Sequence, residues 1–284
     1  MNVRRAVITA AAPNQHTLPL QQLVDRDGQP KTALQLILEE VRAAEIQEIY
    51  LVIQPGDGNE YRRAAGALAD DLHFVEQPAP LGYGHALWMS RDFVGDEPFL
   101  HLVGDHVFLS QTEQRCARQL VNTFRECGCS VSAVHATRET KLPYFGAVGG
   151  QLVPGHAKLY QIARVLEKPT PTQAEQELIT AGLRAGYYLC FFGMHVLTPS
   201  VMKILSDQLD QSAQRVNLSG TLALLAQQER YLALQIQGSR YDLGMKYGLL
   251  LAQLAISLSG RDRDQILTEL LDLTAGGAAS AAVS

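Results

Sequence analysis

Short apolar segments alternate with helix-like segments through the first half of this 284-residue chain. A short apolar run predicts a strand, whereas apolar residues that recur every three or four positions predict a helix with one buried face. Strands are therefore expected at residues 5–12, 49–53, 72–75, 99–103 and 130–135, and helices at residues 32–44, 62–70, 84–91 and 112–126. This alternation predicts an α/β fold with a doubly wound, Rossmann-like and mostly parallel sheet that has helices on both faces.

The sequence changes in character after Pro143, where segments become shorter and richer in glycine and proline. We expect residues 143–240 to add a small antiparallel lobe. Further strands are expected at residues 185–196 and 232–236, and helices at residues 200–207, 222–229 and 247–258. Residues 1–274 should form a single domain, followed at residues 275–284 by a flexible tail of small and polar residues.

The composition is that of an ordinary globular protein, with 46% hydrophobic and 19% charged residues. The formal net charge is -5, and acidic and basic residues are interspersed, so the sequence has no basic stripe for the phosphates of a nucleic acid. No segment approaches the roughly 20 apolar residues of a membrane span, and the N-terminus lacks the apolar core of a signal peptide. We therefore expect a cytoplasmic protein without nucleic-acid or membrane partners.

Three segments that follow predicted strands are candidates for a binding site, at residues 10–16, 104–106 and 238–244. Ligands of open α/β sheets bind at the carboxyl ends of the strands. Asp105 and Asp242 lie in two of these segments, where both could offer a carboxylate to one Mg²⁺ ion. Taken alone, however, an aspartate at the end of a strand is more often a turn or helix-cap residue.

Several motifs follow one another in a fixed order. They are Gln77-Pro78-Ala79-Pro80-Leu81-Gly82-Tyr83-Gly84-His85-Ala86, then Gly104-Asp105, Tyr144-Phe145-Gly146, Leu166-Glu167-Lys168-Pro169 and Gly238-Ser239-Arg240-Tyr241-Asp242-Leu243-Gly244. In these motifs the chain resembles the bacterial UTP–glucose-1-phosphate uridylyltransferases, which are nucleotidyltransferases of the sugar-nucleotide pyrophosphorylase type. The resemblance extends from about residue 7 to residue 258, and the agreement of several motifs in order makes it specific.

The resemblance implies a nucleotide-diphospho-sugar transferase fold whose sugar-binding lobe lies at residues 143–240. It implies that the nucleotide is bound by Ala11, Ala12, Gln77 and Gly82, the sugar phosphate by Gly146, Glu167 and Lys168, and Mg²⁺ by Asp105 and Asp242. It also implies catalytic roles for His16 and Lys168. The residue types suit these roles, since glycine admits the uracil edge close to the backbone, a glutamine amide both donates and accepts, and lysine brings charge to a phosphate.

A structural role is the alternative for some of these residues. Gly82 and Gly84 could serve only the turn into the following helix, and Glu167 with Lys168 could form a solvated loop. His85 is expected to be a residue at the start of a helix rather than a catalyst.

One loop departs from the family pattern. The family has G-x-G-T-R followed by a lysine, and these residues bind the triphosphate, whereas this chain has Ala12-Pro13-Asn14-Gln15-His16. His16 replaces the arginine, and the region of the lysine is shortened, with Lys31 nearby along the chain. A histidine with the ordinary pKa of about 6.5 is mostly neutral at pH 7, and nucleotidyl transfer depends on cations around the phosphates. His106 also follows Asp105 where relatives often have a second acidic residue.

Three hypotheses about function follow. In the first, the chain is a nucleotidyltransferase that forms a nucleoside-diphosphate sugar from UTP, or another nucleoside triphosphate, and a sugar 1-phosphate, with glucose 1-phosphate expected, and releases pyrophosphate. In the second, it is a weakly active or inactive regulatory homologue that binds a sugar nucleotide. In the third, it is a structural or interaction module. The apolar residues at 247–258 and 265–273 would either close a core or form the contact face of a homo-oligomer.

Overall fold

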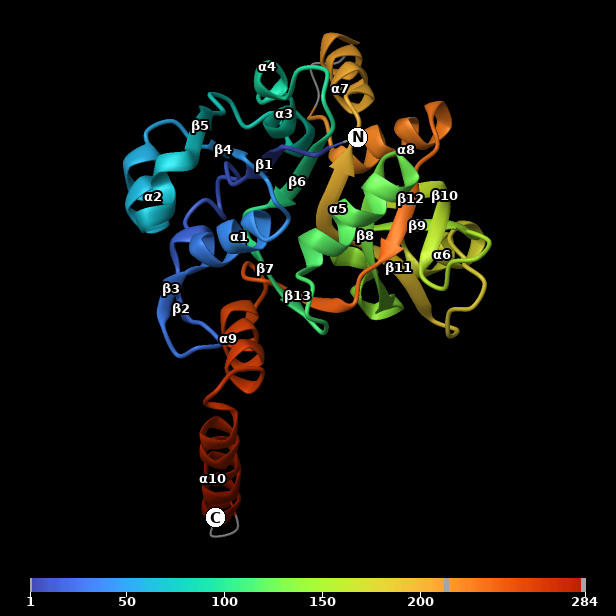
Figure 1. Cartoon of the computed structure of the whole chain (residues 1–284). Helices are drawn as coiled ribbons and strands as arrows, with labels where there is room; N and C mark the ends of the chain where they lie inside the picture. The colour runs from blue at the N-terminus through green and yellow to red at the C-terminus, as the bar shows by residue number, and fades with distance from the viewer. Residues whose placement is uncertain (1, 212–214, 282–284) are drawn as a thin grey trace.

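The centre of the molecule is a nine-stranded sheet with mixed strand directions (Figure 1). The computed structural model describes residues 2–211 and 215–281. The strand order is β5-β4-β1-β6-β11-β8-β12-β10-β9. The bounds are β1 Arg5–Thr9, β4 Glu48–Ile53, β5 Leu72–Glu76, β6 Phe99–Val103, β8 Val131–Arg138, β9 Gly146–Leu152, β10 Leu159–Glu167, β11 Tyr187–Leu197 and β12 Leu232–Gln235.

One half of this sheet is parallel. Strand β1 lies between β4 and β6 and pairs in parallel with both, and β5 continues this half beyond β4. Strands β1, β4 and β6 are largely buried and rich in Val, Ile and Leu, as expected where helices cover both faces of a parallel sheet. The prediction of an α/β fold is confirmed. The strands predicted before residue 104 lie in this half, whereas the strand predicted at residues 130–135 is β8 of the other half.

The other half of the sheet is mainly antiparallel. Strand β11 runs antiparallel to β6 and β8, and β9 runs antiparallel to β10, while β12 is parallel to β8. The sheet as a whole is therefore mixed rather than mostly parallel. The short connection from β9 to β10 can join only antiparallel neighbours, because a parallel pair needs a crossover of about a dozen or more residues. The strands of the expected antiparallel lobe also extend the central sheet instead of forming a separate one.

Two short antiparallel strand pairs lie beside the main sheet. Strand β2 (Gln22–Val24) pairs with β3 (Pro30–Thr32), and β7 (His106–Ser110) pairs with β13 (Gly238–Asp242). The sequence analysis does not predict these strands, because they are short and mostly lack the apolar run of a buried strand. The β7–β13 pair joins two segments that are far apart along the chain.

Helices pack on both faces of the sheet (Figure 1). Helix α1 begins at a capping box, in which the Thr32 hydroxyl accepts from the Gln35 N–H and the Gln35 side chain accepts from the Thr32 N–H. Short 3-10 helices occupy Leu18–Leu20, Gly66–Asp71 and Glu139–Tyr144. The α-helices are α1 Ala33–Arg42, α2 Gly58–Ala65, α3 Tyr83–Trp88, α4 Arg91–Val94, α5 Cys116–Cys127, α6 Pro171–Glu177, α7 Ser200–Gln211, α8 Leu218–Gln228, α9 Gly248–Leu258 and α10 Arg263–Ala281.

The hydrophobic core has two layers, one on each face of the sheet. Ile8 of β1 belongs to the layer that includes α1 and α5, whereas Val7 belongs to the layer that includes α3, α7 and α8. Neighbouring residues of a strand point to opposite faces, so a continuous apolar run indicates burial on both sides. Packing on both faces holds the ends of β1 and β6 in place, and the candidate active site lies at these ends.

Helix α10 projects from the body of the molecule, whereas α9 packs one side against it through Ala252 and Ile256 (Figure 1). Leu250 and Leu251 of α9 are 55% and 54% exposed, and Leu271 and Leu273 of α10 are 68% and 73% exposed. Helix α10 continues through Ala281, where the sequence predicts a flexible tail from residue 275 onward. The alanine-rich composition of this segment favours a helix.

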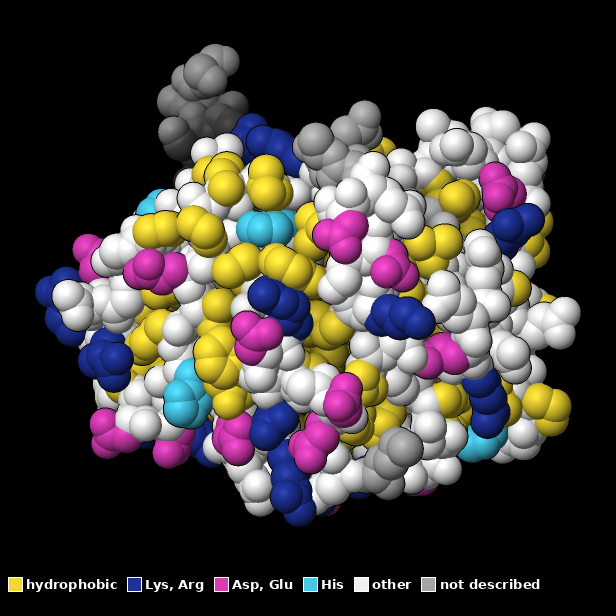
Figure 2. Space-filling view, turned by 90° about the horizontal axis from the view of Figure 1, so that it is seen from above, with side chains coloured by type: hydrophobic (Ala, Val, Ile, Leu, Met, Phe, Trp, Pro, Cys, Tyr) yellow, Lys and Arg dark blue, Asp and Glu magenta, His cyan; other side chains and the backbone are white. Residues whose placement is uncertain are grey.

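The surface seen in Figure 2 carries mixed charges. On this face, the side chains of Lys and Arg are interspersed with those of Asp and Glu, and they do not merge into one basic patch. Among the helices of the described residues, none is long and apolar enough to cross a membrane.

A buried carboxylate connects α1 to α5. Glu40 of α1 accepts a hydrogen bond from the Ala117 N–H at the start of α5, with 2.7 Å between N and Oε1, and a guanidinium nitrogen of Arg115 lies 3.6 Å from Oε2. The first N–H groups of a helix have no partners within the helix, so Glu40 caps α5 from a neighbouring helix. Burial raises the pKa of Glu40, although the Ala117 N–H and Arg115 act in the opposite direction.

We expect Glu40→Ala to lower the free energy of unfolding by about 2 kcal/mol, because the buried Ala117 N–H loses its acceptor. Glu40→Gln keeps a carbonyl acceptor and should lower the free energy of unfolding by a smaller amount. Urea unfolding followed by circular dichroism measures both variants. Equal unfolding midpoints for the wild type and Glu40→Ala would contradict this account of how α5 begins.

Candidate active site

A cavity of about 740 Å³ opens at the carboxyl ends of β1 and β6. Thr9 and Val103, the last residues of these two strands, both line it. Open α/β sheets bind their ligands at this position. The volume lies within the range of about 300–1,000 Å³ that is typical of small-molecule sites. The cavity is therefore the candidate active site.

Most of the predicted site residues meet in this cavity, although they come from distant parts of the chain. His16 and Gly146 are not among the described residues that line it, although Gly146 follows the lining residue Phe145 and lies beside Glu167. The predicted residues that do line the cavity are Ala11, Ala12, Gln77, Gly82, Asp105, Glu167, Lys168 and Asp242.

Gln77 is held in place through its side-chain amide. Its Nε2 lies 3.2 Å from the Gly82 carbonyl oxygen and 2.8 Å from Nδ1 of His85. Burial lowers the pKa of His85, so the neutral ring can accept at Nδ1 a hydrogen bond that the amide donates. His85 therefore orients Gln77.

Gly82 occupies a backbone position that a larger residue would not tolerate. Its φ is +109°, and a Cβ at this position would lie 2.6 Å from the carbonyl oxygen of Val216. Val216 binds the same loop through two backbone hydrogen bonds, from Gly84 N to Val216 O at 2.9 Å and from Val216 N to Leu81 O at 3.2 Å. Gly82 thus makes the turn and allows the two backbones to approach, and it also exposes its backbone to the cavity.

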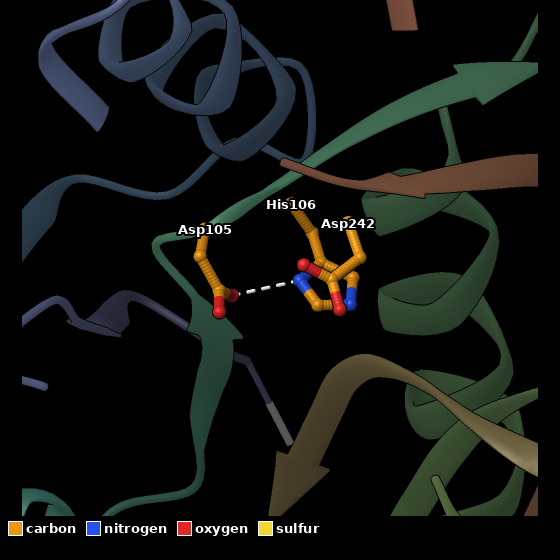
Figure 3. Close-up of side chains that lie close together, drawn as sticks. All are labelled: Asp105, His106 and Asp242. Carbon is orange, nitrogen blue, oxygen red and sulfur yellow. Dashed lines mark hydrogen bonds and ion pairs between the residues drawn. The ribbon is translucent and has the colours of Figure 1, made fainter. Parts of the chain in front are cut away.

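The pairing of β7 with β13 brings the two predicted metal ligands together (Figure 3). Asp242 lies opposite His106 in the register, and Asp105 directly precedes β7. The Leu243 N–H donates to the Asp105 carbonyl oxygen at 2.9 Å and continues the pairing. Ligand atoms of Asp105, His106 and Asp242 all lie within 4.8 Å of one another, and Figure 3 shows the three side chains gathered in one place.

The electrostatics of this cluster favour an ionised Asp105. Burial raises its pKa, but the charge of His106 and a hydrogen bond from the His106 ring, 2.7 Å long, bring the net pKa below its ordinary value. Asp242 accepts from the Gly244 N–H at 2.8 Å, which fixes one carboxylate oxygen. Two carboxylates suit the hard cation Mg²⁺, whereas an imidazole is more typical of transition-metal sites. The donor set therefore fits Mg²⁺ on Asp105 and Asp242, with His106 holding Asp105.

Glu167 and Lys168 lie at the end of β10, and both line the cavity. Lys168 has a φ of +46°, a left-handed conformation that is uncommon for a residue with a side chain. Such strain, about 1 kcal/mol or more, is concentrated at functional sites. The Ser219 hydroxyl donates to Glu167 Oε2 at 2.5 Å, and a Cβ on Gly146 would lie 2.6 Å from the Ser219 oxygen. Gly146 therefore leaves room for the contact that orients Glu167.

His16 points toward helix α2 instead of the cavity. Its Nδ1 lies 2.7 Å from Oδ2 of Asp57 at the start of α2. Lys31, the other nearby cation, lies 2.9 Å from Asp25 and 2.5 Å from Glu39. Neither His16 nor Lys31 belongs to the described lining of the cavity.

The structure adds lining residues that the sequence analysis does not single out. Tyr83 lines the cavity, and its hydroxyl lies 2.6 Å from Nε2 of the buried His101. Arg215 and Met245 also line it. Tyr83 lies inside a recognised motif, which is a signal that could have identified it. Arg215 has no comparable signal, because it precedes α8 outside those motifs.

Comparison with known proteins gives a family match over most of the chain. Residues 18–257 match the family model described as Nucleotidyl transferase. A UTP–glucose-1-phosphate uridylyltransferase of Bacillus subtilis is 27% identical over 293 residues, which cover 93% of this chain and 95% of that protein. UTP–glucose-1-phosphate uridylyltransferase 2 of Streptococcus pyogenes is 28% identical over 285 residues, which cover 90% of this chain and 91% of that protein.

Solved structures share the fold. A UDP-glucose pyrophosphorylase complexed with UDP-glucose matches with a TM-score of 0.73 at 20% identity, over 89% of this chain and 98% of that chain. A UDP-glucose pyrophosphorylase from Acinetobacter baumannii matches with a TM-score of 0.76 at 20% identity, over 95% and 99% of the two chains. The resemblance identified from the motifs is confirmed, and the chain belongs to the nucleotidyl transferase family.

Proposed function

We propose that this chain transfers the uridylyl group of UTP to glucose 1-phosphate, which forms UDP-glucose and releases pyrophosphate. The relatives named as UTP–glucose-1-phosphate uridylyltransferases match 93% and 90% of the chain. The observation that carries the proposal is that one cavity collects the motif residues for base, metal and sugar phosphate, namely Gln77, Gly82, Asp105, Glu167, Lys168 and Asp242.

The reaction replaces one phosphoanhydride bond with another. A phosphate oxygen of glucose 1-phosphate attacks the α-phosphorus of UTP in line, the bond between the α- and β-phosphates breaks, and pyrophosphate leaves with the electron pair. Protein side chains contribute mainly positioning and positive charge to such transfers. Gln77 and the backbone of Gly82 hold the uracil, Lys168 neutralises the sugar phosphate, and Glu167 accepts hydrogen bonds from the sugar hydroxyls.

Asp105 and Asp242 would hold Mg²⁺, since their carboxylates converge beside His106. When bound, Mg²⁺ supplies positive charge to the phosphates of UTP. His106 keeps the Asp105 carboxylate in place through the hydrogen bond of 2.7 Å. Ala11 and Ala12 line the same cavity with small side chains, so the nucleotide can approach their backbone closely.

The main alternative is a weakly active or inactive homologue that binds a sugar nucleotide. It is suggested by the altered loop, in which His16 contacts Asp57 rather than the cavity. The comparisons do not favour it, because the relatives carry the names of active transferases. A structural or interaction module is likewise not favoured for a member of this family. A cytoplasmic location without nucleic-acid or membrane partners stays a prediction.

Asp105→Asn should reduce pyrophosphate release from UTP and glucose 1-phosphate by about 100-fold, because Mg²⁺ loses one of its two carboxylates. A coupled pyrophosphate assay at several Mg²⁺ concentrations measures this loss. Asp207→Asn changes an exposed aspartate on α7 and serves as the matched control. Full activity of Asp105→Asn would contradict the metal assignment. A wild type that binds UDP-glucose but releases no pyrophosphate would instead favour the inactive homologue.

Lys168 and His16 should respond differently to substitution. Lys168→Met removes a positive charge from the cavity and should lower kcat/KM for glucose 1-phosphate about tenfold or more. His16→Ala should change the same constant by less than about threefold, because His16 contacts Asp57 instead. Steady-state kinetics at fixed UTP compare the two variants. An equal loss of kcat/KM in both variants would support a catalytic role for His16.

Helices α9 and α10 are, in our proposal, the contact face of a homo-oligomer. Leu250 and Leu251 of α9 and Leu271 and Leu273 of α10 are more than half exposed, and α10 projects from the body (Figure 1). Exposed apolar surface of this kind is typical of protein–protein contacts.

The double substitution Leu250→Glu and Leu271→Glu should convert an oligomer into a monomer of about 31.1 kDa, because two charges would be buried in the contact. Light scattering coupled to size-exclusion chromatography measures the mass of each form. A wild type that already has the monomer mass at the same protein concentration would contradict this role of α9 and α10.

A further inference from the structure

Arg215 brings to the cavity a positive charge that the recognised motifs do not account for. Among the described residues that line the cavity, Lys168 and Arg215 are the only lysine or arginine. The same lining carries the carboxylates of Asp105, Glu167 and Asp242. The triphosphate of UTP adds several negative charges to this acidic site. Mg²⁺ on Asp105 and Asp242 would offset part of this charge, and positively charged side chains of the lining would offset more of it.

The loop after β1 does not provide this charge. Its residues from Ala10 to Gln15 line the cavity, and none of them is basic. His16, which follows them, directs its ring to Asp57 with 2.7 Å between Nδ1 and Oδ2. Lys31 is bound by two carboxylates away from the cavity. The positive charge that the family places in this loop is thus missing from the nucleotide side.

The backbone beside Arg215 is anchored to the loop that is proposed to bind the base. Val216 O accepts from Gly84 N at 2.9 Å, and Val216 N donates to Leu81 O at 3.2 Å. Three residues further along the chain, Ser219 donates to Glu167 at 2.5 Å. The segment 215–219 therefore runs from the base-binding loop to the sugar-phosphate residues. Arg215 lies at the end of this segment that is next to the base-binding loop.

We propose that Arg215 binds the phosphates of the nucleotide and takes the place of the arginine that the family has in the loop after β1. The proposal rests on the function proposed above for the cavity. A guanidinium keeps its charge at all physiological pH values and can form two parallel hydrogen bonds to a phosphate. In this proposal Lys168 binds the sugar phosphate, and Arg215 binds the phosphates of the nucleotide.

Binding of uridine, UMP, UTP and glucose 1-phosphate to the full chain, measured by isothermal titration calorimetry with Mg²⁺, tests this role. Arg215→Ala should weaken UTP binding about tenfold or more and UMP binding less, while uridine and glucose 1-phosphate bind as to the wild type. Arg215→Lys keeps a charge without the planar fork and should recover part of the loss. Arg164→Ala changes an exposed arginine of β10 outside the lining and should bind all four as the wild type does.

Three outcomes overturn the assignment of Arg215. The first is unchanged UTP binding in Arg215→Ala. The second is an equal loss of affinity for uridine and UTP, which would mean that Arg215 supports only the base-binding loop. The third is a loss of affinity for glucose 1-phosphate alone. The proposed function fails in a different way, since the wild type itself would then bind no UTP and release no pyrophosphate. Circular dichroism of each variant identifies a loss of binding that is caused by unfolding. If Arg215→Ala is unfolded, the titrations of Arg215→Lys test the role of Arg215 in its place.

Discussion

The candidate active site depends on the antiparallel pairing of β7 with β13. Its register runs from Gly238 opposite Ser110 to Asp242 opposite His106. A shift by one residue would turn Asp242 to the other face of the strand and away from Asp105. Backbone hydrogen bonds therefore determine where the two carboxylates meet, and packing of the central sheet holds β6, which leads into β7, in place.

Around this carboxylate pair, the distribution of charge governs what the cavity can do. Three acidic side chains line it, and the proposed substrates are polyanions, so the cations decide whether binding is favourable. These cations come from the end of β10 and from the segment before α8 rather than from the loop after β1. Electrostatic stabilisation depends on distance and solvent exclusion, and not on the order of residues along the chain. A site can therefore keep its chemistry while the source of a charge changes.

The sequence predicts some elements well because their signal is local. The strand at residues 99–103 is found as β6 Phe99–Val103, since an apolar run between turns is typical of a strand buried on both faces. The strands β2, β3, β7 and β13 escape prediction, because they are short and become strands only through their partners. The same limit applies to strand direction, which depends on the path of the connections. Only part of the predicted parallel sheet is accordingly parallel.

The sequence by itself determined the family and pointed to several of the residues that line the cavity, among them Gln77, Asp105 and Lys168. Motifs in a fixed order carry this information because it depends on residue type and spacing alone. The tertiary structure alone decided that His16 turns to Asp57 and that Arg215 reaches the cavity. The direction of a side chain is set by neighbours from distant segments, which packing brings together and which no local pattern contains.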